Sequence, residues 1–237
     1  MKLVGERRAL AAAVMAFWFL LYVVIAYAQI LPDFTKAFVA IAGVYGLAFF
    51  ALVAGYFWAR WYAVGVGLYG VITAAVGMWQ IGAEPVLLFV GGTHAAAALM
   101  LWGSAMSQPY DGQTAWRERF HMDDNAVQRL GRSVIRAGVS LPFVLLYALA
   151  PKPDSVSLLA SIVALALTGL GIRALVQMKT WGVLALGAAG VLLTTLAGVD
   201  LLQGDGIAVL KPALAGVLLL AAAVPFAAPM ARWVAAR

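Results

Sequence analysis

The 237-residue sequence contains no cysteine and few charged residues. The lack of cysteine excludes disulfides, thiolate nucleophiles, cysteine-ligated zinc and iron–sulfur clusters. Only 11% of the residues are charged and 65% are hydrophobic, whereas a soluble domain is about 25% charged and about 45–50% apolar. This composition excludes a water-soluble enzyme, a disordered chain and a nucleic-acid-binding domain. It favours a protein that crosses a membrane several times.

Acidic residues are missing from the middle of every long apolar run, and the sequence has only two histidines, His94 and His121. Proton-coupled pumps usually rely on carboxylates inside the membrane. Lipid-processing enzymes need paired carboxylates or several histidine ligands. A P-loop, a Rossmann glycine motif and a nucleophile elbow are all absent. We therefore expect no catalytic activity, no metal site and no cofactor.

Eight apolar runs are long enough to be membrane-spanning helices, since a helix that crosses about 30 Å of hydrocarbon needs about 20 apolar residues. They cover residues 9–30, 37–58, 61–81, 86–106, 134–150, 157–177, 181–202 and 207–230. The first run resembles a secretory signal peptide. It is longer than the apolar core of about 7–15 residues that such peptides have, so we expect it to be kept as a span.

Basic residues gather on one side of the predicted spans. If the spans alternate in direction, 13 of the 16 lysines and arginines lie on the side of the N-terminus, and the other side holds only Lys36, Lys152 and Lys211. Loops rich in lysine and arginine stay in the cytoplasm. The sequence therefore predicts a multi-pass protein of the bacterial cytoplasmic (inner) membrane with both termini in the cytoplasm.

The two halves of the chain share a pattern of small and aromatic residues. Trp61, Gly67 and Gly70 match Trp181, Gly187 and Gly190 at an offset of 120 residues. Each half holds four spans, so both halves enter from the same side, as in parallel repeats. We expect an all-α polytopic membrane bundle with two parallel four-helix repeats, at residues 1–106 and 134–237, joined by a cytoplasmic amphipathic linker at residues 107–133. The alternative is chance similarity between two halves that are both rich in Gly, Ala and Leu.

His94 is the only histidine, acidic or basic side chain near the middle of a predicted span, and Thr93 precedes it. About eight residues into a helix correspond to about 12 Å of depth. An ionisable group at that depth is by default a candidate functional site. The alternative is a neutral histidine that bonds a backbone carbonyl or a neighbouring hydroxyl and serves packing.

The linker carries candidate contacts for lipid at the inner leaflet or for a protein partner. These residues are Trp116, Arg117, Arg119, Arg129, Arg132 and Arg136. Asp123, Asp124 and Asn125 are candidate N-caps of a helix that runs into the fifth span. Such a basic helix can lie at the membrane surface and hold lipid phosphates.

The short loops leave no room for a catalytic or sensory domain. We therefore expect a non-catalytic integral membrane subunit, accessory to a larger inner-membrane complex. Its partners would be membrane lipids and other integral membrane subunits, and not nucleic acid. The main alternative is a small transporter or channel for a neutral or lipid-like molecule, with a path near His94. A weaker alternative is a membrane partner of a quinone or haem redox enzyme.

Overall fold

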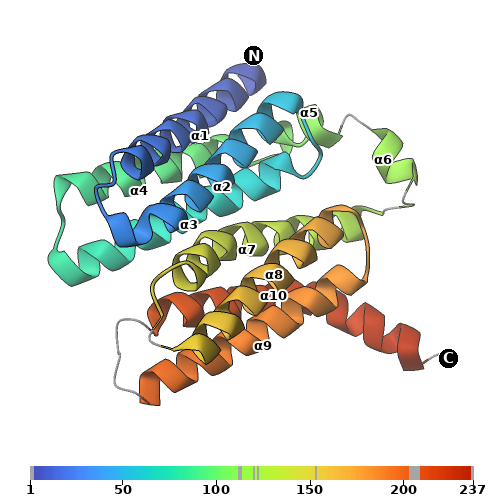
Figure 1. The fold of residues 1–237 in the computed structure, drawn as a ribbon. Helices are drawn as coiled ribbons and strands as arrows, with labels where there is room; N and C mark the ends of the chain where they lie inside the picture. The colour runs from blue at the N-terminus through green and yellow to red at the C-terminus, as the bar shows by residue number, and fades with distance from the viewer. Residues whose placement is uncertain are drawn as a thin grey trace. The chain divides into compact units, whose positions relative to one another are not determined.

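The computed structural model describes residues 3–111, 114–119, 121, 123–152, 154–202 and 209–235, with side chains except at 111, 114–116 and 227–235. These residues form helices and short connections, and no strand occurs among them. The chain divides into two compact units, Met1–Arg119 and Phe120–Arg237 (Figure 1). The expected all-helical fold is confirmed, and each unit is described by itself.

Unit 1 is a bundle of four long helices followed by short helical turns. The long helices are α1 (Val4–Tyr27), α2 (Thr35–Ala54), α3 (Ala59–Ile81) and α4 (Pro85–Met100). The short ones are η1 (Pro32–Phe34), η2 (Ser104–Met106), α5 (Gln108–Asp111) and α6 (Thr114–Arg119). Helix α1 packs mainly on α2, and α3 packs mainly on α4.

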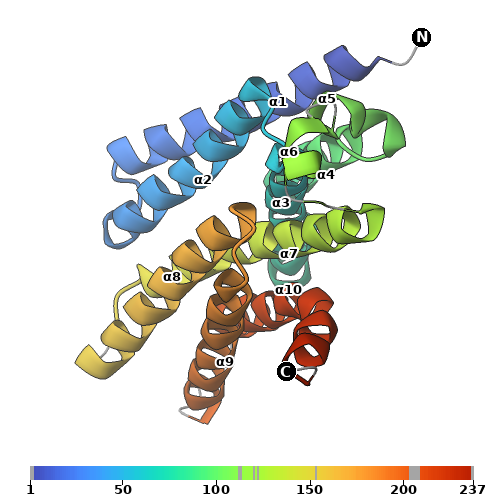
Figure 2. The ribbon, with the colours of Figure 1, turned by 90° about the vertical axis from the view of Figure 1, so that its right-hand side faces the viewer.

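Unit 2 also has four long helices, but they pair differently. They are α7 (Asp124–Ala148), α8 (Ser155–Val176), α9 (Trp181–Leu202) and α10 (Leu210–Ala235). Helix α7 packs mainly on α10, and α9 lies between α8 and α10 (Figure 2). Among the helices that are long and apolar enough to cross a membrane, α7 has the largest share of buried residues. Helix α7 is therefore the core helix of its unit.

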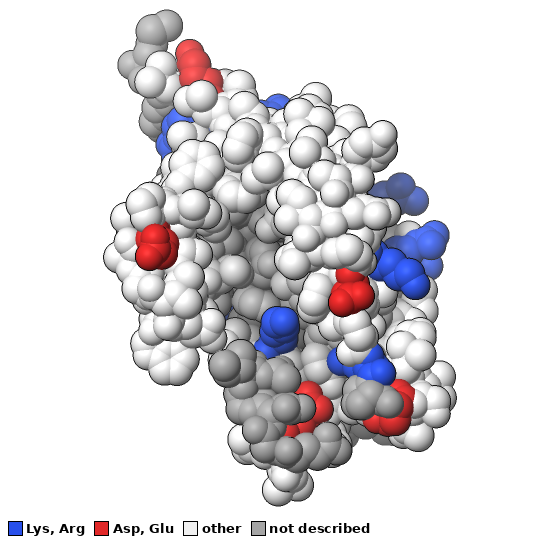
Figure 3. All heavy atoms as spheres, turned by 60° about the vertical axis from the view of Figure 1, so that its left-hand side comes forward, with Lys and Arg blue, Asp and Glu red and all other residues white. Residues whose placement is uncertain are grey.

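Six of the described helices are long and apolar enough to cross a membrane: α1, α2 (with the η1 turn before it), α3, α7, α8 and α9. Helix α4 is shorter, and α10 is apolar over Leu210–Phe226. The face drawn in Figure 3 is largely uncharged and carries a few charged side chains. The chain thus has the features of a multi-pass membrane protein.

The predicted fourth span at residues 86–106 is not one straight helix. Helix α4 ends at Met100, and the chain turns by 75° into the segment Ser104–Tyr110. Gly103 lies at the turn with a φ of +104°, a backbone conformation that residues with a Cβ rarely adopt. The prediction of a continuous span was wrong here, because an apolar run does not reveal a glycine-dependent bend.

The predicted linker and the fifth span share a single helix. Helix α7 starts at Asp124, ten residues before the predicted span at residues 134–150. The backbone N–H of Ala126 donates to Oδ1 of Asp123 at 2.6 Å, which satisfies one of the free N–H groups at the helix start. The predicted N-cap at Asp123 is therefore confirmed, and the end of the linker is helical.

Glycines allow the closest contacts between helices. A Cβ on Gly182 would lie 2.8 Å from the carbonyl oxygen of Gly171 on α8, and a Cβ on Gly190 would lie 3.0 Å from that of Gly216 on α10. Small residues let helix backbones approach in lipid, where no hydrophobic effect drives association. Not all the matched glycines act in this way, because a Cβ on Gly187 would meet only the Ala223 side chain, at 4.0 Å.

A row of polar side chains on α7 bonds to backbone carbonyls of α10. The Ser133 hydroxyl donates to Ala222 O at 2.7 Å, Nη1 of Arg136 donates to Ala221 O at 2.6 Å, and the Ser140 hydroxyl donates to Ala215 O at 3.0 Å. Pro225 stands four residues after Ala221. Since proline has no N–H, it leaves the carbonyl of the residue four positions earlier without its helical donor. Arg136 supplies the missing bond.

We expect replacement of Arg136 by Met to lower the free energy of unfolding by about 1–3 kcal/mol, because the Ala221 carbonyl loses its donor. The loss should be smaller in a Pro225→Ala background, where the substituted residue has a backbone N–H that can take over. Chemical unfolding in detergent micelles measures the loss of stability in the wild-type and the Pro225→Ala backgrounds. Arg132→Met is the control, since Arg132 is exposed and bonds only within its own turn. Equal losses in both backgrounds would contradict this role of Arg136.

We expect a pH-dependent contribution to stability from Asp154, the N-cap of α8. Its carboxylate accepts bonds from the backbone N–H and the hydroxyl of Ser157 at 2.8 and 2.7 Å, which lower the pKa of Asp154 below its usual 3.8. A lowered pKa in the folded state gives stability that is present above the unfolded-state pKa and is lost as the pH falls through the folded-state value. As the pH falls, the melting temperature of the wild type should therefore decrease more than that of Asp154→Asn, whose side chain still caps the helix but carries no charge. If the melting temperatures of the two proteins fell in parallel with pH, the contribution of the Asp154 charge would be contradicted.

Candidate functional site

His94 lies at the centre of unit 1, and its side chain is 1% exposed. Helix α4 begins with Pro85 at its first turn, where a proline fits, and it carries His94 ten residues into the helix. On the facing helix α3, a Cβ on Gly70 would overlap the imidazole ring. The absence of a side chain at Gly70 is therefore what makes room for His94.

Both ring nitrogens of His94 are hydrogen-bonded. Nδ1 lies 2.7 Å from the carbonyl oxygen of Val90, one turn earlier on α4, and Nε2 lies 2.6 Å from the hydroxyl of Tyr45 on α2. A carbonyl can only accept, so Nδ1 carries the proton and donates it. The Tyr45 hydroxyl then donates to Nε2. This arrangement matches a neutral imidazole with no free nitrogen.

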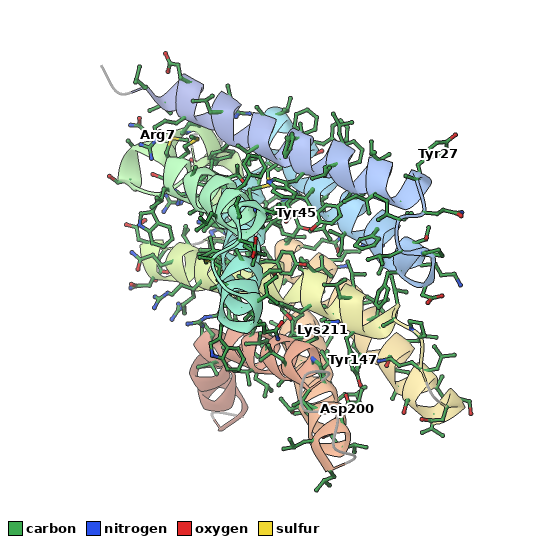
Figure 4. The ribbon with its side chains drawn as sticks, turned by 90° about the vertical axis from the view of Figure 1, so that its left-hand side faces the viewer. Arg7, Tyr27, Tyr45, Tyr147, Asp200 and Lys211 are labelled. Atoms are coloured by element: carbon green, nitrogen blue, oxygen red, sulfur yellow. The ribbon has the colours of Figure 1, made fainter. Side chains whose placement is uncertain are left out.

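Aromatic side chains of α1 and α2 complete the surroundings of His94. The Trp18 ring lies 4.6 Å from the imidazole, centroid to centroid, and its Nε1–H donates to the Thr93 hydroxyl at 3.3 Å. The Tyr22 ring stacks on Tyr45 at 5.4 Å. We call Trp18, Tyr45, Gly70, Thr93 and His94 the His94 cluster. It takes residues from all four long helices of unit 1, and Figure 4 labels Tyr45 in the interior of this unit.

The geometry of the His94 cluster limits its chemistry. A haem iron or another metal would need a lone pair on Nε2, which accepts the bond from Tyr45. The Thr93 hydroxyl donates to Phe89 O at 2.8 Å while it accepts from Trp18. No group of three His, Cys, Asp or Glu residues suited to a metal ion occurs in the described part of the chain. The contacts of the cluster connect all four long helices of unit 1.

The structure separates the basic residues that were predicted as lipid or partner contacts. Arg117 and Arg119 belong to α6 in unit 1, and the side chain of Trp116 lies outside the described residues. On α7, Arg132 is exposed and Arg129 is half-buried, but Arg136 is bonded to Ala221 O. Arg129 and Arg132 thus remain candidates on the surface of unit 2, and Arg136 has an internal partner.

Sequence reasoning missed a role for three arginines of unit 1. Nε of Arg8 donates to Leu52 O at 2.9 Å near the end of α2, and Nη2 of Arg7 donates to Trp102 O at 2.7 Å beyond the end of α4. Nη1 of Arg60 donates to Gly103 O at 3.2 Å. The last carbonyls of a helix lack helical partners and carry partial negative charge. The available signal was the position of these arginines at predicted span ends, which was interpreted only as orientation.

A second cluster at one end of unit 2 was also missed. Nζ of Lys152 lies 3.2 Å from the centroid of the Tyr147 ring, and the Tyr147 hydroxyl donates to Oδ2 of Asp200 at 3.2 Å. Figure 4 labels Tyr147, Asp200 and Lys211 in this region. Burial lowers the pKa of Lys152, and so does the charge of Lys211, while Asp200 acts in the opposite direction. No spacing rule connects a loop lysine to the end of a helix 48 residues later.

We expect Gly70→Ala to destabilise unit 1 by about 1–3 kcal/mol, because the added Cβ overlaps the His94 ring and forces the packed helices apart. Gly92→Ala on α4 is the matched control, since a Cβ there meets nothing within 4 Å. Thermal unfolding in detergent should show a lower midpoint for the first variant and an unchanged or higher midpoint for the second. A wild-type midpoint for Gly70→Ala would mean that the cluster does not fix the helix spacing.

No model of a known protein family matches this chain, and neither a curated protein nor a solved structure matches it. The interpretation of its function therefore comes from its own residues and their contacts.

Proposed function

We propose that the protein is a non-catalytic integral membrane subunit, accessory to a larger complex of the bacterial inner membrane. It would cross the membrane eight times, with both termini in the cytoplasm, as two parallel four-helix repeats. The helices α1–α4 and α7–α10 would be the spans. Its contributions to the complex would be helix surfaces and lipid contacts.

The observation that carries this proposal is the state of the His94 cluster. The most reactive side chain inside the apolar helices has both nitrogens bonded within the protein. A catalytic or transport group needs a free position for its substrate, and this histidine offers none while Tyr45 and Val90 hold it. The interpretations of His94 as a point on a transport path or as a haem ligand have correspondingly less support.

The outer surface of the helices then remains for function. Helix α8 has the smallest buried share among the candidate spans. Its large exposed side chains are Val156, Leu158, Leu159, Ile162, Val163 and Leu170, which are 41–75% exposed. In a membrane such a face meets either lipid tails or the helix of another subunit. Because lipid tails are as apolar as these side chains, complementary packing decides between them.

The contacts of the arginines support the proposed orientation. Arg7, Arg8 and Arg60 lie at the end of unit 1 where α2 and α4 terminate, and they bond to carbonyls there. The acidic Asp33 and Glu84 lie in the loops at the other ends of these helices. Loops that hold most of the basic residues face the cytoplasm. This assignment places the N-terminus and the end of α4 on the cytoplasmic side.

The glycine contacts support the proposed repeat. Gly70 on α3 packs against His94 on α4, and the matched Gly190 on α9 packs against Gly216 and Leu220 on α10. From Thr73, which matches Thr194, the offset becomes 121 residues, so that His94 corresponds to Ala215, which adjoins Gly216. The same pair of helices in each unit thus meets at a glycine. The units differ elsewhere, since α1 packs mainly on α2 whereas α7 packs mainly on α10.

We expect the chain, tagged and expressed at its natural level, to elute from mild detergent with other integral membrane proteins in fixed stoichiometry. The absence of cysteine allows a direct test of the α8 surface. A thiol cross-linker on Leu159→Cys should give one product of defined mass. Ala164→Cys is the control, because Ala164 lies on the same helix and is 0% exposed.

Elution of the chain alone, with no cross-linked product at residue 159, would contradict the accessory role. Solute flux through proteoliposomes that contain only this chain, abolished by His94→Ala, would instead establish the transporter alternative.

A further inference from the structure

At one end of unit 1 the structure brings together Arg7, Arg8, Arg60 and a buried tyrosine, Tyr110. Arg7 and Arg8 are neighbours on α1, Arg60 is near the start of α3, and Tyr110 lies on α5. Arg8 and Tyr110 are in contact, since the guanidinium carbon of Arg8 lies 5.3 Å from the centroid of the Tyr110 ring. Arg7 and Arg60 bond to Trp102 O and Gly103 O, two adjacent carbonyls.

The arginines keep donors that the protein does not use. A guanidinium has five N–H groups. Arg7 bonds only through Nη2 among the described residues, and Arg8 bonds through Nε and Nη2. Nε and Nη1 of Arg7 and Nη1 of Arg8 are therefore available to an acceptor. Glu6, also in the first turns of α1, is exposed, and no salt bridge joins it to these arginines in the described part of the chain.

The Tyr110 hydroxyl has no hydrogen-bond partner among the residues that the structure describes. The residue is 1% exposed, and its oxygen is the one buried side-chain nitrogen or oxygen in the described part of the chain without a hydrogen bond. Leaving a buried hydroxyl unpaired costs about 1–3 kcal/mol, and such a group calls for an explanation such as a missing ligand. Burial raises the pKa of Tyr110, and the positive charges of Arg8 and Arg60 act in the opposite direction. An unpaired donor beside guanidinium groups is suited to an anion.

Exposed apolar side chains surround this end of unit 1. Four such side chains are 54–68% exposed: Leu3 just before α1, Leu10 on α1, Leu99 in the last turn of α4 and Trp102 just beyond it. Free phosphate makes no contact with apolar side chains of this kind, whereas the acyl chains of a lipid would cover them. Basic pockets between helices on the cytoplasmic side are a known setting for anionic lipid headgroups.

We propose that Arg7, Arg8, Arg60 and Tyr110 form a binding site for the phosphate group of an anionic phospholipid at this end of unit 1. The phosphate oxygens accept from the unused N–H groups of Arg7 and Arg8 and from the Tyr110 hydroxyl, while the acyl chains lie along α1 and α4. Because the hydroxyl is covered, neighbouring atoms have to shift before the phosphate reaches it. This site is independent of the accessory role, so either proposal can fail alone.

The test uses the full-length protein with the substitution Tyr110→Phe, which removes only the hydroxyl. Native mass spectrometry from mixed micelles gives the apparent Kd for phosphatidylglycerol and for phosphatidylcholine. We expect the wild type to prefer the anionic lipid, and Tyr110→Phe to weaken phosphatidylglycerol binding about tenfold, as expected for a lost hydrogen bond to a charged group. Tyr27→Phe is the control, because Tyr27 is 90% exposed at the far end of α1 (Figure 4).

A second measurement separates a lipid site from a structural role of the hydroxyl. In lipid-free detergent, Tyr110→Phe should melt at the wild-type temperature or above it, since the hydroxyl has no partner to lose. Added phosphatidylglycerol should then stabilise the wild type more than the variant. Arg7→Gln, which removes a charge but keeps a donor for the α4 carbonyls, should also weaken binding of the anionic lipid.

Three results would overturn the proposal. The first is unchanged phosphatidylglycerol binding by Tyr110→Phe. The second is a lower melting temperature of this variant without lipid, which would reveal a protein partner for the hydroxyl. The third is equal stabilisation of the wild type by soluble glycerol phosphate, which would make free phosphate and not lipid the ligand.

Discussion

The structure depends on one constraint: its apolar helices contain polar donors but almost no side-chain acceptors for them. Every buried donor in hydrocarbon needs a partner within the protein. Here the partners are backbone carbonyls. The imidazole of His94 donates to Val90 O, the serines and Arg136 of α7 donate to α10, and the arginines of unit 1 donate to carbonyls at helix ends. Three side-chain acceptors are exceptions. Nε2 of His94 accepts from Tyr45, the Thr93 hydroxyl accepts from Trp18, and Asp200, near the end of α9, accepts from Tyr147.

This constraint explains which parts of the fold could be predicted. Long apolar runs bounded by charges or prolines predict helices, because each helix satisfies its own backbone. Six of the predicted runs correspond to described helices that are long and apolar enough to cross a membrane. The bend after α4 depends on the φ of Gly103, and a hydropathy pattern contains no information on backbone torsion. The N-cap at Asp123 was predictable because its interaction is local, three residues along the chain.

The candidate site was predictable only in part, for the same reason. The position of His94 in an apolar run singles it out, and the choice between a functional and a packing role depends on Tyr45, which is 49 residues away. Arg7 and Arg8 were recognised as charges at a span end, but their acceptors lie on α4 and α2. Contacts between helices distant in sequence depend on how the helices pack, and a single sequence does not specify that packing.

The bond from Arg136 to Ala221 has a consequence for the way the protein is made. The two residues are 85 positions apart, which ribosomes translate in about 4–17 s at about 5–20 residues per second. Helix α7 therefore enters the membrane seconds before its acceptor exists. Throughout that time the guanidinium must be held by water, by lipid phosphates or by the insertion machinery. Unit 2 can complete its core only after α10 has been synthesised.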